Sequence, residues 1–157
     1  MLAGSADTNG IQTITLATAG TGNSVLGAIV SPAGSLADGG AYGVPQDTPV
    51  LIPATKTRSY YVLVADDPNI IFEVQEDSVG GAITVTNLAL NHNLVAGTNN
   101  GYVSGWMLDS SGAATTATLQ MKILGLARRN DNAVGTYAKW LCIINNHAYR
   151  IGQAGTA

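Results

Sequence analysis

Short segments of alternating apolar and polar residues fill most of this chain, which is the pattern of half-buried β-strands. The clearest alternation runs from Thr116 to Leu126. Its apolar and polar faces are Leu119, Met121 and Ile123 against Thr118, Gln120 and Lys122. No window of helical length repeats its apolar residues at helical spacing, so the pattern predicts strands throughout.

Two other segments, Tyr60–Ala65 and Tyr137–Asn145, are apolar on both faces. A strand covered on both sides is central to a sheet or barrel, so we expect both segments inside the fold. Residues 66–69, Asp-Asp-Pro-Asn, then predict a tight connection. The segment that follows, Ile70–Glu76, alternates and predicts a strand with one wet face. We take Tyr60–Ala65 and Ile70–Glu76 as a pair that forms the nucleus of the fold.

Turn-forming residues separate the remaining apolar segments. The further strands that we expect are Ile11–Thr18, Ser24–Val30, Ala82–Thr86, Tyr102–Leu108 and a short edge strand at Ala148–Ile151. Gly80-Gly81 predicts a hairpin loop, and Asn145-Asn146-His147 predicts a turn. The total of about eight short strands is typical of an all-β sandwich or barrel with an extended N-terminal arm.

The chain divides by composition into three parts. Residues 1–55 read as an N-terminal arm with one or two short strands, residues 56–151 as the β core, and residues 152–157 as a flexible tail. Ser31–Thr55 holds four of the five prolines, so it is a poor candidate for a helix or a regular strand. We expect this segment to lie against a neighbouring subunit or against its own domain.

Hydrophobic residues make up 46% of the chain and charged residues only 11%, against roughly 25% in a typical soluble domain. Such a surface suits a protein that partners cover, and equally an ordinary neutral β domain. The net charge is −3, and no basic residue precedes Lys56. Because no basic cluster exists, we expect no nucleic-acid partner. Arg128-Arg129 is the only adjacent basic pair, and it predicts a solvated loop.

The single cysteine, Cys142, excludes an intrachain disulfide and a cysteine-based metal site. Its apolar surroundings predict a buried, inert thiol. Met1–Ser5 lacks the features of a signal peptide, and no segment has the apolar length that spans a bilayer. We therefore expect no membrane partner.

The residues offer few candidates for chemistry. No Gly-x-Ser-x-Gly motif is present, and His92 and His147 lie far apart without a metal-binding neighbour. Glu73, Glu76 and Asp77 could hold Ca²⁺ but lack the spacing of a calcium loop. Asp66-Asp67 could be a carboxylate dyad, although a turn before Pro68 explains the pair more simply. We expect neither an enzyme nor a cofactor.

Aromatic residues recur in the apolar segments and leave a sugar-binding platform open as an alternative. They are Trp106, Trp140, Tyr60, Tyr61, Tyr102 and Tyr137. In strands such residues are usually core or interface anchors.

Several segments, taken in order, resemble small structural proteins of tailed bacteriophages. They are Arg58–Pro68, Phe72–Gln75, Leu108–Ser110, Met121–Leu126 and Ile144–His147, and the resemblance covers roughly Gly27 to Arg150. The family it points to is that of head decoration, or cement, proteins. This resemblance implies a β-rich protein, commonly a homotrimer, that binds the outside of the capsid shell. The implied partner is the major capsid protein and the implied location is the virion exterior, after synthesis in the host cytoplasm.

The leading hypothesis is therefore a capsid cement protein. The alternatives are a tail-associated or receptor-binding β module and, ranked last, a metal-dependent β-barrel enzyme. As candidate subunit or capsid interface residues we name Pro45, Pro49, Pro53, Arg58, Tyr102, Trp106, Arg128 and Arg129.

Overall fold

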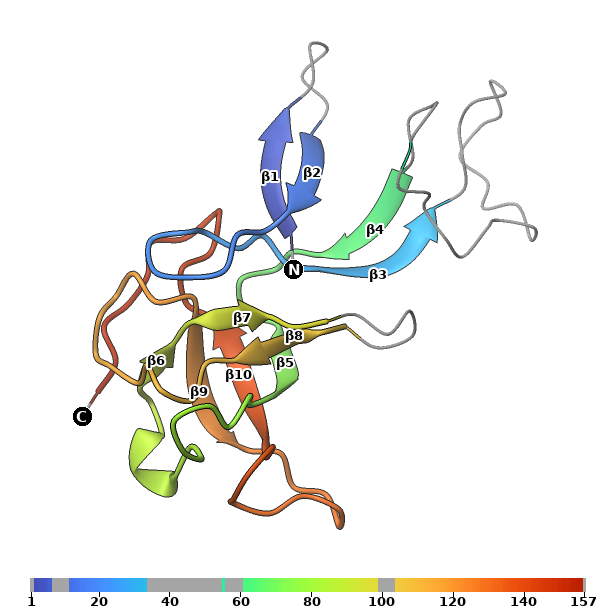
Figure 1. The fold of residues 1–157 in the computed structure, drawn as a ribbon. Helices are drawn as coiled ribbons and strands as arrows, with labels where there is room; N and C mark the ends of the chain where they lie inside the picture. The colour runs from blue at the N-terminus through green and yellow to red at the C-terminus, as the bar shows by residue number, and fades with distance from the viewer. Residues whose placement is uncertain (1, 7–11, 34–54, 56–60, 99–103, 157) are drawn as a thin grey trace.

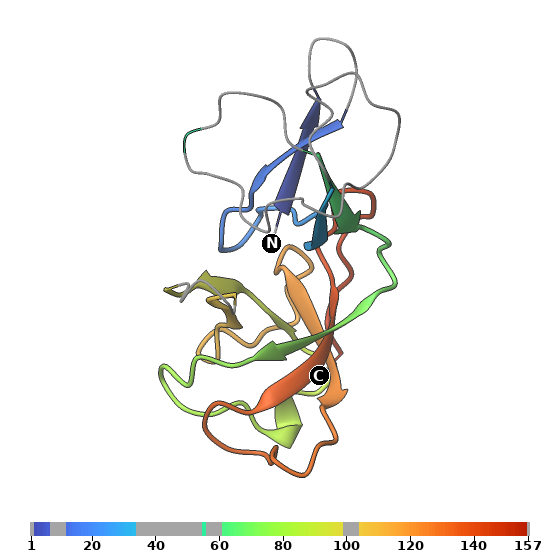
Figure 2. The ribbon, with the colours of Figure 1, turned by 90° about the vertical axis from the view of Figure 1, so that its right-hand side faces the viewer.

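The structure is a computed structural model that describes residues 2–6, 12–33, 55, 61–98 and 104–156 (Figures 1 and 2). These residues form strands and one short 3₁₀ turn, η1 (Val85–Asn87), and no α-helix. The strands are β1 (Leu2–Ala6), β2 (Gln12–Leu16), β3 (Ala28–Ala33), β4 (Tyr61–Ala65), β5 (Ile71–Gln75), β6 (Asn91–His92), β7 (Leu94–Ala96), β8 (Trp106–Leu108), β9 (Met121–Leu126) and β10 (Lys139–Ile144). The expected all-β class is confirmed.

The core is a partly open barrel. Its main sheet has the antiparallel order β5-β10-β9-β6. After β6 the chain passes through Asn93 directly into β7, which pairs with β8. A single parallel bridge between Glu76 and Leu108 then joins the β8 side back to the β5 side. Between β5 and β8 the wall of the barrel is therefore incomplete.

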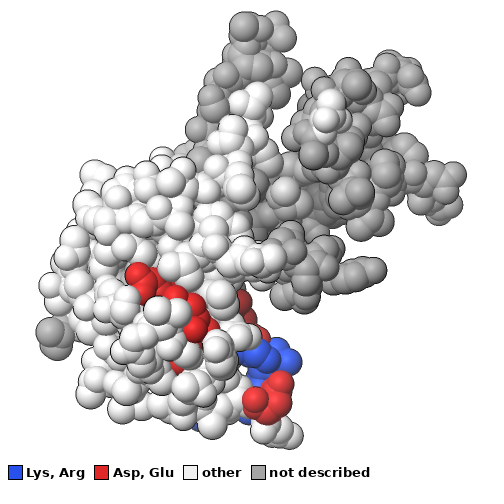
Figure 3. All heavy atoms as spheres, viewed as in Figure 1, with Lys and Arg blue, Asp and Glu red and all other residues white. Residues whose placement is uncertain are grey.

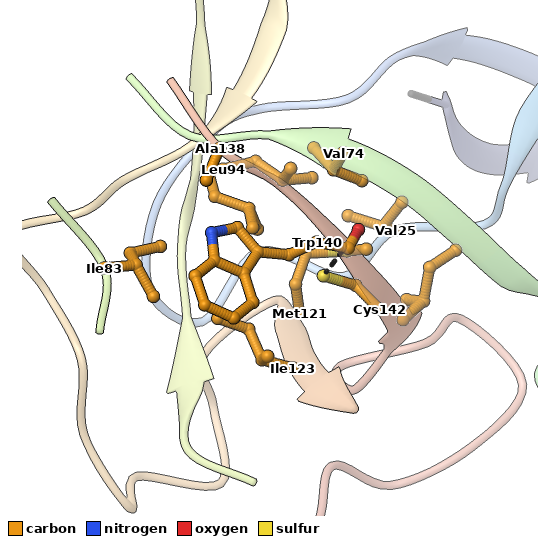
Figure 4. Close-up of a cluster of buried hydrophobic side chains, with 11 residues drawn as sticks. Val25, Val74, Ile83, Leu94, Met121, Ile123, Ala138, Trp140 and Cys142 are labelled. Carbon is orange, nitrogen blue, oxygen red and sulfur yellow. Dashed lines mark hydrogen bonds between the residues drawn. The ribbon is translucent and has the colours of Figure 1, made fainter. Parts of the chain in front are cut away.

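The central strand is β10, which pairs with β5 on one side and β9 on the other. The prediction of a central strand at Tyr137–Asn145 is confirmed. Trp140, Cys142 and Ile144 point into the core and are buried. The Trp140 ring lies in the middle of the apolar cluster, with Ile83 beside it (Figure 4). The buried thiol of Cys142 agrees with the sequence-based expectation.

The alternation before and within β9 is confirmed on its apolar face, where Leu119, Met121 and Ile123 are buried. The opposite face differs from the prediction. Gln120, expected on a solvated face, is completely buried. A polar side chain is tolerated there because its amide is fully hydrogen-bonded, as described below.

The expected nucleus was wrong in one respect: β4 and β5 do not pair with each other. Among the described residues β4 pairs only with β3, and β5 pairs with β10. The connection at residues 66–69 is the expected turn, because the Asn69 amide donates to Asp67 Oδ1 at 2.8 Å. This turn redirects the chain out of the β3–β4 ribbon and into the barrel instead of folding β5 back on β4.

Two expected strands are absent from the described residues. At Ala82–Thr86 the Thr84 amide donates to Asn87 Oδ1 at 2.8 Å, which closes η1 instead of a strand. Val85 is consequently exposed. The segment Ala148–Ile151 makes one isolated bridge, between Arg150 and His147. Gly80 and Gly81 do form a turn with positive φ, but no hairpin of strands flanks it.

Some residues of the expected arm (1–55) and of the expected tail (152–157) contact the core. Val25 and Leu26, in the expected arm, are buried with the core, and β3 continues through Pro32 to Ala33. The C-terminal residues also contact the core: the Gln153 amide donates to Asn145 Oδ1 at 3.0 Å, and the Thr156 amide donates to Ala89 O at 3.1 Å. The backbone of Gly152–Thr156 is thus held against the barrel by hydrogen bonds.

Candidate interaction surface

The β3–β4 ribbon extends away from the barrel, at the same end of the molecule as β1 and β2 (Figure 1). The part of the chain that the structure describes gives this ribbon two strands, with a bulge between Ile29 and Ser31. Its side chains include exposed apolar residues: Val30 is 69% exposed and Leu63 is 57% exposed. An isolated two-stranded ribbon is marginally stable in water, and exposed apolar strands of this kind are typical of interaction sites.

Close backbone contact fixes the base of this ribbon. Gly27 precedes β3 and lies directly against Ala65, the last residue of β4. A Cβ atom at position 27 would lie 2.0 Å from Ala65 O, so no other residue fits there without a backbone shift.

The β1–β2 ribbon is a second two-stranded antiparallel element, in which Leu2 lies opposite Leu16. Leu16 is 72% exposed. At the other end of β2, the Tyr149 hydroxyl donates to Gln12 Oε1 at 2.8 Å and links the ribbon to the C-terminal part of the chain. Described residues 12–33 and 61–65 contain no charged side chain.

The buried amide of Gln120 fastens the N-terminal segment to the barrel. Its Oε1 accepts hydrogen bonds from the amides of Gly20 at 2.9 Å and Leu94 at 3.1 Å. Its Nε2 donates to the carbonyls of Thr18 at 2.8 Å and Asn23 at 3.1 Å. Three of these four partners lie in the segment that connects β2 to β3, so one side chain positions the bases of both ribbons.

A groove of about 530 Å³ lies at the incomplete wall between β5 and β8. Phe72, Val74, Trp106 and Met107 supply its apolar lining, and polar residues that include Lys139 lie around them. Phe72 and Trp106 also pack against the buried core cluster. Trp106, named from the sequence as a candidate interface residue, therefore lies in a real concavity.

On the face shown in Figure 3, the visible charged side chains lie on the barrel and away from the two ribbons. Arg129 Nη1 lies 2.8 Å from Glu73 Oε1, and its Nε lies 3.3 Å from Asp131 Oδ1. Lys139 Nζ lies 3.5 Å from Asp131 Oδ2. Glu73 and then Asp131 raise the pKa of Arg129 above its usual value. These exposed pairs add little stability but keep this end hydrated.

The sequence-named interface residues are only partly placed. Those outside the described residues are Pro45, Pro49, Pro53, Arg58 and Tyr102. Arg128 and Arg129 are exposed at the charged end, far from the ribbons, and Arg129 is engaged by acids of its own chain. The exposed apolar residues of the ribbons were missed, because a run such as Tyr60–Ala65 has the same pattern in a buried strand and in an unpartnered one.

The carboxylates considered for calcium all have protein partners. Two donors reach Glu76 Oε2, the Ile83 amide at 2.7 Å and Trp140 Nε1 at 3.2 Å. Burial opposes ionisation of Asp77, but hydrogen bonds from Ser110 and Val79 outweigh it and lower the Asp77 pKa. Within the described ranges no group of three or more metal-ligating side chains exists.

The two histidines are buried separately. His92 Nδ1 lies 3.0 Å from Asp109 O, so this nitrogen is the donor and carries the proton. His147 Nδ1 accepts the Tyr149 amide at 3.0 Å, so the opposite tautomer is present there. Burial lowers the pKa of both side chains. His147 therefore bonds backbone two residues away, whereas His92 lies in β6 and bonds the carbonyl of Asp109, 17 residues further along the chain.

No family model, curated protein or solved structure matches this chain. None of the helices among the described residues is long and apolar enough to cross a membrane.

Replacing the buried amide tests its fastening role. We expect Gln120→Leu to lower the free energy of unfolding by about 1–3 kcal/mol, because it leaves buried backbone groups unpaired. Hydrogen exchange should accelerate at the amides of Gly20 and Leu94. Gln75→Leu, the same change at an exposed position of β5, is the control. Unchanged exchange at both amides would show that Gln120 does not hold this segment.

The histidines predict a loss of stability in mild acid. Because their folded-state pKa values are lowered, the unfolded chain binds more protons, and stability falls as the pH drops below about 6.5. The limit is roughly 1.4 kcal/mol per pH unit for each histidine. Urea unfolding at pH 7 and pH 5 measures this loss.

The matched variant is His92→Asn/His147→Asn, which keeps polar atoms near both Nδ1 positions but cannot titrate. Its stability should change less between pH 7 and pH 5 than that of the wild type. Equal changes in the two proteins would assign the acid sensitivity to groups other than the two histidines.

Proposed function

We propose that this chain is a structural virion protein that binds the outer surface of a tailed-phage capsid shell and stabilises it. The order of sequence segments from Gly27 to Arg150 supports this proposal through its resemblance to head decoration proteins. Its partner is the major capsid protein, and it acts on the virion exterior after synthesis in the host cytoplasm. Attachment of this kind requires contact area and a rigid scaffold, with no catalysis and no cofactor.

The observation that carries the proposal is the β3–β4 ribbon. It combines exposed apolar side chains, including Val30 and Leu63, with the absence of charge in its described residues. Burial of one such side chain at an interface contributes about 1.5–3 kcal/mol. Among the described residues no further strand pairs with β3 or β4, so their outer backbone groups are available to a strand of the partner.

Charge supports one orientation on the shell. The ion pairs of Arg129 and Lys139 are satisfied within the chain, and the loop between β9 and β10 that carries Arg129 lies away from the ribbons (Figure 1). We propose that this charged end faces solvent while the β3–β4 ribbon faces the shell. Arg128 and Arg129 then keep the decorated particle soluble instead of contacting the capsid protein, which revises their role as interface candidates.

Many copies of the protein bind one shell, so each single contact can be weak and the attachment as a whole still be stable. A homotrimer presents three ribbons at once, and the second and third contacts become intramolecular after the first one forms. A decorated shell is then stabilised by many small interfaces. This multivalency also explains why each ribbon needs only a few exposed apolar residues.

Co-sedimentation with undecorated phage heads tests the proposal. Purified protein is mixed with expanded heads and, in parallel, with unexpanded precursor shells. We expect binding to expanded heads at a fixed ratio to the shell protein. Leu63→Asp should weaken binding roughly 10–100-fold, because it places a charge where an apolar side chain is buried.

Leu124→Asp is the matched control, since Leu124 is 46% exposed on β9 and lies outside the ribbons. It should bind as the wild type does. If the wild type binds neither kind of shell, the proposal fails, and a glycan screen that follows Trp106 fluorescence becomes the test of the receptor-binding alternative. Metal analysis of the purified protein would similarly test the enzyme alternative.

A further inference from the structure

A second pocket, of about 540 Å³, lies where the turn after β10 meets the segment before β9. Its described lining includes Thr118, Asn146, His147, Tyr149, Arg150 and Ile151. Burial lowers the pKa of His147, so this side chain is neutral near pH 7. Arg150 is then the one charged side chain in the described lining.

The guanidinium of Arg150 is held in place, but no described acid neutralises it. Its Nη2 donates to Ile144 O at 2.7 Å, which fixes one edge of the group. Its Nε is buried and has no hydrogen-bond partner among the described groups. The ion pairs of the described residues involve Arg129 and Lys139 instead. Partial burial of an unpaired cation costs free energy, and a carboxylate from outside the chain would offset that cost.

The pocket adjoins the segments that carry both ribbons. The Ala148 amide donates to Val25 O at 3.0 Å, shortly before β3 begins. The Tyr149 hydroxyl is bonded to Gln12 of β2. A partner that covers the ribbons is therefore within reach of Arg150.

Apolar side chains flank the arginine. Tyr149 is 55% exposed and Ile151 is 86% exposed, although both line the pocket. Arginine and tyrosine are enriched at the centres of protein interfaces. When a partner covers such apolar neighbours, water is excluded and the attraction between Arg150 and an opposite charge becomes stronger.

We propose that this pocket binds an aspartate or glutamate side chain of the shell protein, with Arg150 as the cation. The guanidinium donates to the carboxylate through the hydrogens that Ile144 O does not engage. The side chains of Thr118 and Asn146 line the same pocket and can donate further hydrogen bonds. This inference rests on the proposed function, because it adds an ionic contact to the apolar contact of the β3–β4 ribbon.

Sodium acetate probes the pocket without capsids. Acetate, exchanged for sodium chloride at constant ionic strength, should shift the amide NMR signals of Asn146 and Ile151 in a saturable way. Arg150→Gln should abolish this response. Arg128→Gln is the matched control, since Arg128 is exposed in the loop between β9 and β10, and it should respond as the wild type does. No saturable shift in the wild type, or an equal shift in Arg150→Gln, would overturn the proposal.

Co-sedimentation with expanded heads tests the shell protein as the source of the carboxylate. Arg150→Gln should weaken binding roughly 30-fold or more, because the carboxylate of the partner is left unpaired at the interface. Arg150→Lys keeps the charge but not the planar donor group, so its loss should be smaller. Arg128→Gln should bind as the wild type does.

The two proposals fail in different ways. Equal binding of heads by Arg150→Gln and the wild type would overturn this inference and leave capsid attachment standing. A wild type that binds acetate in the pocket but binds no heads would reject attachment, and with it the shell protein as the partner, while the carboxylate site would remain.

Discussion

The hydrogen bonds of one buried amide hold the architecture together. The Gln120 side chain accepts hydrogen bonds from two backbone amides and donates hydrogen bonds to two backbone carbonyls. Three of these four groups belong to the segment between β2 and β3. Because the amide is fully satisfied, it can be buried without a large desolvation cost. This segment follows β2 and precedes β3, so the positions of both ribbons relative to the barrel depend on it.

In the proposed function, the barrel provides the rigid part of the molecule and the β3–β4 ribbon provides the contact with the partner. The barrel buries Trp140 on its central strand and provides a stable base. The β3–β4 ribbon carries exposed apolar residues without charge, whereas Arg129 and its partners occupy the other end. Such a division suits a protein that acts by attachment, with one end for partners and one end for solvent.

The sequence predicted the structure correctly where a local residue pattern is compatible with only one kind of local structure. The alternation before and within β9, the apolar strand around Trp140 and the turn at residues 66–69 all depend on local chemistry, and each was predicted. The exposure of Leu63 on β4 was not predicted, because an apolar run has the same pattern whether or not its own chain covers it. Burial of Gln120 was also missed, since its partners Thr18 and Asn23 lie about a hundred residues away in sequence.

Hydrogen–deuterium exchange of the chain, free and bound to expanded heads, tests attachment through the β3–β4 ribbon most directly. The account predicts that amides of Ala28–Ala33 and Tyr61–Ala65 become protected on binding, while the amides of β10 exchange slowly in both states. Protection of the charged loop at residues 128–135 with no change in the ribbon would contradict it.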